Sequence, residues 1–315
     1  MSDNVIYMLP KEGNLYKTNL HCHSTVSDGK FSPEQLKKMY MARGYSAIAY
    51  TDHRVCVPHN ELTDENFVAL TGVEIACGIR QANSIHVCGI ARNPDSEFLI
   101  ENEMSDEVAL VNAGIKKLKE YDCITTLNHP RWSGMSMDTV SKIDSVDNVE
   151  VVNGYEMIQD GYGDSSAIYE LELRRGRRVA PFATDDSHTM SAPDTAGYEY
   201  FRGFTVIKAK ELTYSALTEA LDSGSYYAST GPLFKNLYLK DGVLHVECTP
   251  VRGVYVHGKH YSHRAAYLVG DNSVESVEIN VEKFLESSPF LYVKIFDTDG
   301  KCAWSAPLYI SGENK

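Results

Sequence analysis

Histidines and carboxylates gather at or near the carboxyl ends of the apolar, strand-like runs in this sequence. The histidines placed in this way are His21, His23, His53, His86, His129 and His188. The accompanying carboxylates are Asp28, Asp52, Glu74, Asp185 and Asp186. Imidazole and carboxylate groups without cysteine suit Zn²⁺, Mn²⁺ or Fe²⁺ better than Ca²⁺ or an iron–sulfur cluster. Because these groups are too many for one ion, the sequence predicts a site for two or three divalent metal ions.

Each of these positions, taken alone, also has an ordinary structural explanation: a strand-end cap, a turn residue or a hydrogen-bonded core histidine. His21 and His23 are two residues apart on a predicted strand, which points both side chains to one face. Glu74 follows an apolar run, where a carboxylate needs a cation or a metal as partner. His129 precedes Pro130, which predicts an extended backbone. The prediction of a metal site therefore depends on the combination, since separate segments all supply the same kinds of group.

The elements that would position these groups alternate between strand and helix over the first part of the chain. The strand-like runs span residues 15–23, 45–53, 67–75, 84–90, 123–130, 149–156 and 179–186. A capping-box pattern at Ser32 and Gln35 predicts one helix, and two more are predicted from Ser105 and over residues 165–175. This alternation predicts an α/β fold with a parallel sheet, here a barrel, with its active site at the carboxyl ends of the strands.

The pattern changes after Gly231, where apolar and polar residues alternate around Asp-Gly turns. Such alternation predicts antiparallel strands with one buried face. We therefore expect two domains, a barrel over residues 1–230 and a small β-sandwich-like accessory domain over residues 231–315.

The composition narrows the class of protein. With 315 residues, of which 43% are hydrophobic, the chain is long enough to bury a sizeable core. Its net charge of −13 disfavours a nucleic-acid footprint, because an acidic surface repels the phosphate backbone. No transmembrane segment and no signal peptide are predicted, and the seven cysteines form no CxxC pair. We expect a cytoplasmic protein with reduced thiols and no membrane partner, and the sequence indicates no oligomeric state.

Residues 18–188 carry, in order, an HxH followed by a turn Asp, a DH, a Glu, a His inside a strand, an HP and a DxH. This series resembles the motifs of the PHP (polymerase and histidinol phosphatase) family of metal-dependent phosphoesterases. The resemblance implies a distorted (β/α)7 TIM-like barrel, with Glu74 bridging two ions. It also implies three ligand sets: His21, His23, Glu74 and Asp186 for the first ion, Glu74, His86 and His129 for the second, and Asp28, His53 and His188 for the third.

The family resemblance implies a phosphoesterase that hydrolyses a small phosphorylated metabolite through a metal-bridged hydroxide. Residues 203–232 resemble, more loosely, a stand-alone branch of the family that includes carbaryl-hydrolase-like proteins. A carboxylester or carbamate hydrolase on the same metal site is therefore one alternative, and a non-catalytic metal-binding module is another. A ligand residue at every motif position favours an enzyme.

Glu74 and Asp186 are predicted to be catalytic through the metal site, together with Arg131. Arg131 directly follows the HP motif, and an arginine fork matches phosphate oxygens. The sequence identifies no general acid, and Asp52 and Asp185 are the candidates. Asp185 is also a candidate acceptor for a ligand histidine.

Two further clusters are favoured as structural. The arginine-rich run over residues 174–178 is typical of a helix C-terminus, where basic residues complement the dipole. His257, His260 and His263 are spaced by three and could form a second metal site, but no carboxylate accompanies them in the sequence. We therefore expect an exposed polar loop there.

Overall fold

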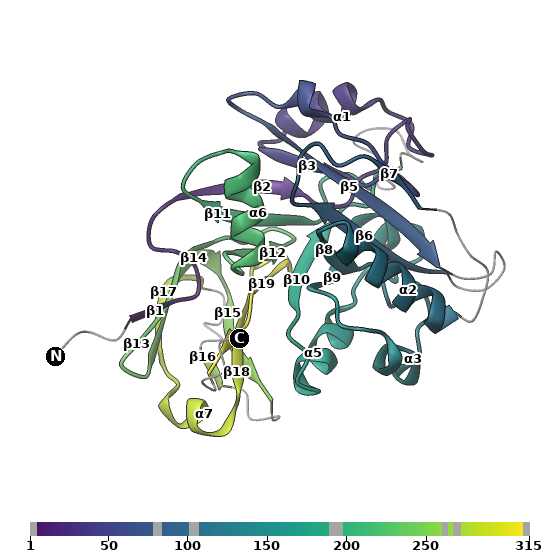
Figure 1. Cartoon of the computed structure of the whole chain (residues 1–315). Helices are drawn as coiled ribbons and strands as arrows, with labels where there is room; N and C mark the ends of the chain where they lie inside the picture. Colours follow the sequence, from purple (N-terminus) through teal and green to yellow (C-terminus); the bar gives the residue numbers. More distant parts are fainter. Residues whose placement is uncertain are drawn as a thin grey trace.

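A curled α/β sheet forms the first part of the chain and antiparallel layers form the rest (Figure 1). The computed structural model describes residues 5–77, 84–100, 107–188, 198–259, 264–266 and 272–310. The strands of the curled part are β2 (Asn14–Asn19), β3 (Ala47–Tyr50), β5 (Val68–Cys77), β6 (Ile85–Ala91), β8 (Cys123–Leu127), β9 (Asn148–Asn153) and β10 (Ala180–Thr184). The helices that connect them are α1 (Pro33–Met41), α2 (Glu107–Glu120), α3 (Met137–Lys142), α4 (Gly154–Gln159) and α5 (Ser166–Arg174).

The curled sheet has the order β10-β9-β8-β6-β5-β3-β2, and strand β6 runs against both of its neighbours. Only residues 78–84 separate β5 from β6. A parallel connection needs a dozen or more residues, so the chain must return antiparallel here. Between β3 and β5 the described chain has a short strand, β4 (Val55–Cys56), which pairs with β7 (Phe98–Leu99), and a 3-10 turn (Asn60–Leu62) in place of a helix. The α/β class is confirmed, but the (β/α)7 count of the distorted barrel is not, and the sheet is a half-barrel.

The two ends of the half-barrel meet just beyond strands β2 and β10. Cys22 and Ser187 form an isolated parallel bridge. The Asp186 N–H donates to the His21 carbonyl at 3.0 Å, and the His23 N–H donates to the Ser187 carbonyl at 3.3 Å. This seam, residues 21–23 against residues 186–187, brings the first and the last of the sequence motifs side by side.

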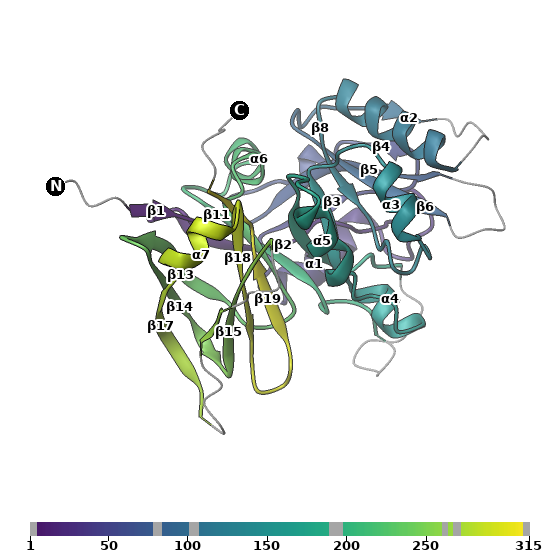
Figure 2. The same ribbon diagram turned by 90° about the horizontal axis from the view of Figure 1, so that it is seen from below.

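The curled sheet continues past β2 into the C-terminal part. Strands β11 (Phe204–Ala209) and β12 (Tyr226–Ser229), linked by α6 (Tyr214–Asp222), follow β2. The same sheet then passes through β19 (Cys302–Ser305), β18 (Phe290–Phe296), β15 (Gly253–Gly258) and β16 (Arg264–Ala266), with β20 (Leu308–Tyr309) beside β18. A second sheet has the order β1 (Val5–Tyr7), β13 (Phe234–Lys240), β14 (Val243–Val251) and β17 (Val274–Asn280), and α7 (Glu282–Ser287) follows β17. Figure 2 shows the two layers side by side.

Pairings cross the predicted division between residues 230 and 231. Strand β1, from the start of the chain, pairs with β13, and β12 pairs with β19. One hydrophobic cluster contains both Leu36 of α1 and Val246 of β14. The division into two folding units stays a prediction.

Helices α1 and α2 form for the reasons that the sequence indicated. The Ser32 hydroxyl accepts from the Gln35 N–H, and the Gln35 side chain accepts from the Ser32 N–H, which completes the capping box. Helix α2 buries Val111, Ile115 and Leu118 against the sheet, a contribution of about 1.5–3 kcal/mol for each side chain. The predicted start at Ser105 lies outside the described residues. None of the described helices has both the length and the apolar character needed to cross a membrane.

Candidate metal centre

Glu74, near the end of β5, lies at the centre of the predicted site and is almost fully buried. Its two carboxylate oxygens lie between 3.1 and 3.6 Å from ring nitrogens of five histidines: His21, His23, His53, His86 and His129. These histidines come from four separate segments of the chain. Glu74 therefore occupies the place that a ligand shared between ions requires.

The nine predicted ligands form three overlapping groups. In each group the candidate ligand atoms lie within 4.8 Å of one another. The groups are His21, His23, Glu74 and Asp186; Glu74, His86 and His129; and His23, Asp28, His53 and His188. The structure thus brings together all nine residues in the sets that the family resemblance implies, with His23 added to the third.

In the inner group, formed by His21, His23, Glu74 and Asp186, the spacing of the ligand atoms is compatible with a shared metal ion. Asp186 Oδ1 lies 3.1 Å from His21 Nε2 and 3.2 Å from His23 Nε2. Ligand bonds of about 2.1 Å in a tetrahedral site put neighbouring ligand atoms about 3.4 Å apart. Asp186 Oδ1 is also buried without a hydrogen-bond partner among the described residues. Such an atom has lost its hydration, and a cation would compensate for that loss.

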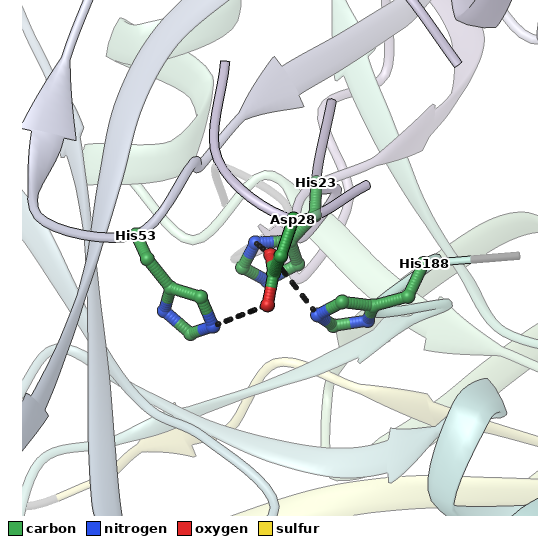
Figure 3. Close-up of side chains that lie close together, drawn as sticks. All are labelled: His23, Asp28, His53 and His188. Atoms are coloured by element: carbon green, nitrogen blue, oxygen red, sulfur yellow. Dashed lines mark ion pairs between the residues drawn. The ribbon is translucent and has the colours of Figure 1, made fainter. Parts of the chain in front are cut away.

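The third group contains the most exposed of the candidate ligands, Asp28 (Figure 3). The Asp28 carboxylate is 55% exposed, and it points between the rings of His23, His53 and His188. Each of the three ring-nitrogen-to-oxygen distances is 3.6 Å. That distance is too long for a hydrogen bond and matches the edge of a metal polyhedron. Burial lowers the pKa of His53 to about 4 and lowers the pKa of His188, so both imidazoles are neutral at neutral pH.

In the inner group, the pKa values of His21 and His23 shift in the opposite direction and are raised. Burial disfavours the His23 imidazolium, but the nearby Asp186 and Glu74 carboxylates outweigh it and raise the pKa of His23 to about 9. Burial likewise opposes the charged forms of Glu74 and Asp186, yet the surrounding histidines, His21 foremost, hold the pKa of both carboxyls well below the ordinary range. The inner group therefore holds buried carboxylates that need positive charge, from protons or from metal ions.

Two of the candidate ligands sit on strained backbone. The φ angle is +26° at His129 and +50° at Asp186, in the left-handed region that non-glycine residues rarely adopt. The extended backbone expected at His129 from the following Pro130 is therefore wrong. The tight turn after β8 overrides the pre-proline preference, because the His129 N–H donates to the Glu150 carboxylate at 2.7 Å.

The two general-acid candidates hold loops in place. Asp52 accepts hydrogen bonds from the backbone and hydroxyl groups of Ser24 and Ser27, within the loop that carries Asp28. Asp185 accepts from the Tyr40 hydroxyl and from three consecutive N–H groups at residues 201–203. These contacts do not support proton transfer by either carboxylate, nor do they make Asp185 an acceptor for a ligand histidine.

Arg131 lies beside the site without contacting a candidate ligand through its guanidinium in the described structure. The guanidinium donates to the Asp164 carbonyl at 3.4 Å and lies 5.3 Å from the centre of the Tyr162 ring. Its backbone N–H donates to the Ser165 hydroxyl at 3.2 Å. The side chain is exposed, and its role in binding phosphate stays a prediction.

The clusters that were expected to be structural have ordinary partners. In the arginine-rich run, Arg174 pairs with Glu170 at 3.2 Å and Arg175 pairs with Glu172 at 3.4 Å. The expected exposed loop is wrong for His257, which lies half-buried on strand β15, where its ring stacks on Tyr292. Its Nδ1 lies 3.6 Å from Glu170 Oε1. His260 and His263 lie outside the described residues.

Sequence reasoning missed several polar side chains that hold the ligands. Asn128 donates to Glu74 at 2.6 Å, and Asn153 donates to both Glu150 and Asp186. Glu150 is fully buried and lies 2.9 Å from His21. A signal for Glu150 was available, because it stands inside the apolar run Val149–Val152, where a carboxylate needs partners.

Comparisons with known proteins give partial matches. No family model matches the chain. Over 78 residues it is 35% identical to the 5'-3' exoribonuclease of Haemophilus influenzae, a match that covers 24% of this chain and 28% of that protein. The chain thus aligns with little more than a quarter of the length of this curated relative.

Three solved structures are similar at low identity. A two-domain protein from Bacteroides vulgatus, containing a predicted PHP-like metal-dependent phosphoesterase, has a TM-score of 0.49 and 15% identity, covering 96% of this chain and 98% of its own. A protein from Bifidobacterium adolescentis described as a metal-dependent phosphoesterase has a TM-score of 0.42 and 14% identity. The match covers 59% of this chain and 91% of that one. An amidohydrolase from Chromobacterium violaceum has a TM-score of 0.40 and 14% identity. The match covers 65% of this chain and 96% of that one.

Proposed function

We propose that the chain is a metal-dependent phosphoesterase that hydrolyses a small phosphorylated molecule. The observation that carries this proposal is the position of Glu74, whose two oxygens lie among five histidine rings. The nine clustered ligands suit two or three ions of Zn, Mn or Fe. Such ions, when bound, polarise a phosphoryl oxygen and lower the pKa of water, which is the chemistry that phosphoester hydrolysis requires.

The residues around the cluster can position a substrate. Asp28 is the most exposed of the ligands, so substrate enters from its side. The Trp132 ring packs edge-on against His129, and the Tyr155 ring lies 5.1 Å from His188, so aromatic surface flanks the cluster. Arg131 would turn its fork toward a phosphoryl oxygen. The inner group is buried, which excludes bulk water and strengthens every charge interaction there.

The Haemophilus influenzae match favours one second candidate, an exoribonuclease that cleaves phosphodiesters. The net charge of −13 opposes a long nucleic-acid footprint, so we favour the small substrate. A carbamate or carboxylester hydrolase on the same metal site remains the alternative indicated by residues 203–232.

The test compares substrate classes on protein purified without chelator. Elemental analysis comes first, and it should give more than one Zn, Mn or Fe per chain. A panel of phosphorylated metabolites, p-nitrophenyl phosphate, its bis-ester, a 5'-phosphorylated oligoribonucleotide and a naphthyl carbamate is then assayed with each metal. Turnover of monoesters supports the proposal. Turnover restricted to the oligoribonucleotide would support the exoribonuclease instead, and turnover restricted to the carbamate would support the carbamate hydrolase. A protein that binds no metal even after addition would refute the proposal.

A further inference from the structure

Glu150 accepts hydrogen bonds from four donors on separate parts of the fold. Its Oε1 lies 2.9 Å from His21 Nδ1 and also accepts from the Thr184 hydroxyl. Its Oε2 accepts from the His129 N–H at 2.7 Å and from the Asn153 side-chain amide at 2.9 Å. A carboxylate is an acceptor only, with room for about four donors, so all of its sites are used.

The contact with His21 determines which of its ring nitrogens faces the cluster. His21 Nε2 lies 3.2 Å from Glu74 and 3.1 Å from Asp186, so it is the nitrogen directed at the cluster. A neutral imidazole carries one proton, and an acceptor-only partner at Nδ1 requires that proton to be there. The lone pair is then left on Nε2, where a cation needs it.

The other oxygen of Glu150 holds the two strained ligand residues. It binds the His129 N–H directly, at the residue whose φ is +26°. It binds the Asn153 amide, which also donates to Asp186 Oδ2 at 3.0 Å, and Asp186 has a φ of +50°. A non-glycine residue keeps a positive φ angle only where several contacts from the surrounding structure hold it there.

We propose that Glu150 is a positioning residue, which directs His21 Nε2 into the metal centre and holds His129 and Asp186 in their strained conformations. The inference rests on the proposed metal site and extends it to a residue that is not a ligand. Glu150 acts on two of the ligand groups at once. His21 and Asp186 belong to the inner group, and His129 belongs to the group with Glu74 and His86.

An isosteric amide distinguishes this role from simple packing. In Glu150→Gln, one orientation of the amide places its NH₂ group opposite the His129 N–H and the Asn153 amide. Donors then face donors, and both hydrogen bonds are lost. The other orientation sets its NH₂ against His21 Nδ1, so a neutral His21 must carry its proton on Nε2, where it blocks a cation. Either way the ligand geometry is lost while the volume of the side chain is kept.

The experiment measures Zn²⁺ affinity by chelator competition and bound metal by elemental analysis in wild type, Glu150→Gln and Glu150→Asp. Glu172→Gln is the matched control, because Glu172 is a mostly buried carboxylate on α5 that pairs with Arg175 instead of a ligand. Affinity should fall by about 10–100-fold in Glu150→Gln, the usual effect of removing a partner of a ligand histidine. It should stay within a few-fold of wild type in the control. Glu150→Asp keeps an acceptor-only group and should retain more affinity than Glu150→Gln.

A second readout is the histidine ¹⁵N spectrum of the zinc-loaded protein, which reports the metal-bound nitrogen. His21 should be bound through Nε2 in wild type and in Glu150→Asp. Wild-type affinity in Glu150→Gln overturns the role, and so does an Asp variant as weak as the Gln variant. If Glu150→Gln does not fold, the spectrum of Glu150→Asp decides, and an unbound His21 in that folded variant overturns the proposal. A wild-type protein without metal affinity refutes the proposed function together with this role, whereas unchanged binding in Glu150→Gln refutes this role alone.

Discussion

Replacing Glu74 with glutamine should damage the metal centre more than the loss of any single histidine of the second or third ligand set. Glu74 is 1% exposed, and its oxygens lie within 3.6 Å of five imidazoles. Removing one partner from a buried charged pair costs about 3–5 kcal/mol. Since about 1.4 kcal/mol corresponds to a factor of ten, the affinity of the ions that share Glu74 should fall by roughly 10²- to 4 × 10³-fold. His86→Ala removes one ligand of one group and should cost less.

The assay is chelator competition with Zn²⁺ and Mn²⁺, followed by hydrolysis of p-nitrophenyl phosphate at saturating metal. Glu172→Gln serves again as the control for the loss of a carboxylate away from the centre. Glu74→Gln should bind fewer ions per chain and lose most turnover at every metal concentration. Affinity and turnover within a few-fold of wild type would refute the shared-ligand reasoning, and so would a larger loss in His86→Ala.

Three further predictions concern protons and the C-terminal part. In metal-free protein, protonation of His23, whose pKa is raised from 6.5 to about 9, stabilises the fold fully below pH 6.5, and this stabilisation is lost as the pH rises to 9. Denaturant unfolding in chelator should show this decline, and a flat profile contradicts it. Glu156 is buried, its Oε2 has no hydrogen-bond partner among the described residues, and burial raises its pKa to about 8. Glu156→Gln should therefore make the protein more stable than wild type above pH 8, and equal unfolding midpoints there would count against this. Replacing His257, His260 and His263 with alanine should leave metal content unchanged and phosphoester turnover within a few-fold, and loss of an ion would show that the site extends into residues 231–315.

The ligand residues could be predicted from sequence because their signals are local. The two-residue spacing of His21 and His23 fixes a common face on any strand. A carboxylate such as Glu74 at the end of an apolar run requires a partner of opposite charge. The structure adds that His23 belongs to two groups, which depends on how the loop carrying Asp28 folds back.

Other features could not be predicted because they depend on contacts that are distant in sequence. Asp52 and Asp185 stand at strand ends as the ligands do, yet they accept hydrogen bonds from loop serines and loop N–H groups. The φ angle of His129 is set by Glu150, 21 residues along the chain. The reversed direction of β6 followed from the short connection after Cys77, which was open to prediction from loop length alone.

The seam between residues 21–23 and residues 186–187 has a consequence for how the centre is assembled and exchanged. Cys22 and Ser187 are 165 positions apart in sequence, so closing this contact is among the longest loop closures in the curled sheet. During synthesis the inner ligand group stays incomplete until β10 has left the ribosome. An ion held by His21, His23 and Asp186 would join both edges of the half-barrel and would stabilise the closed form by mass action. Opening of the seam would then be coupled to metal release, so we expect the exchange rate of the Asp186 and His23 amide hydrogens to fall on metal loading.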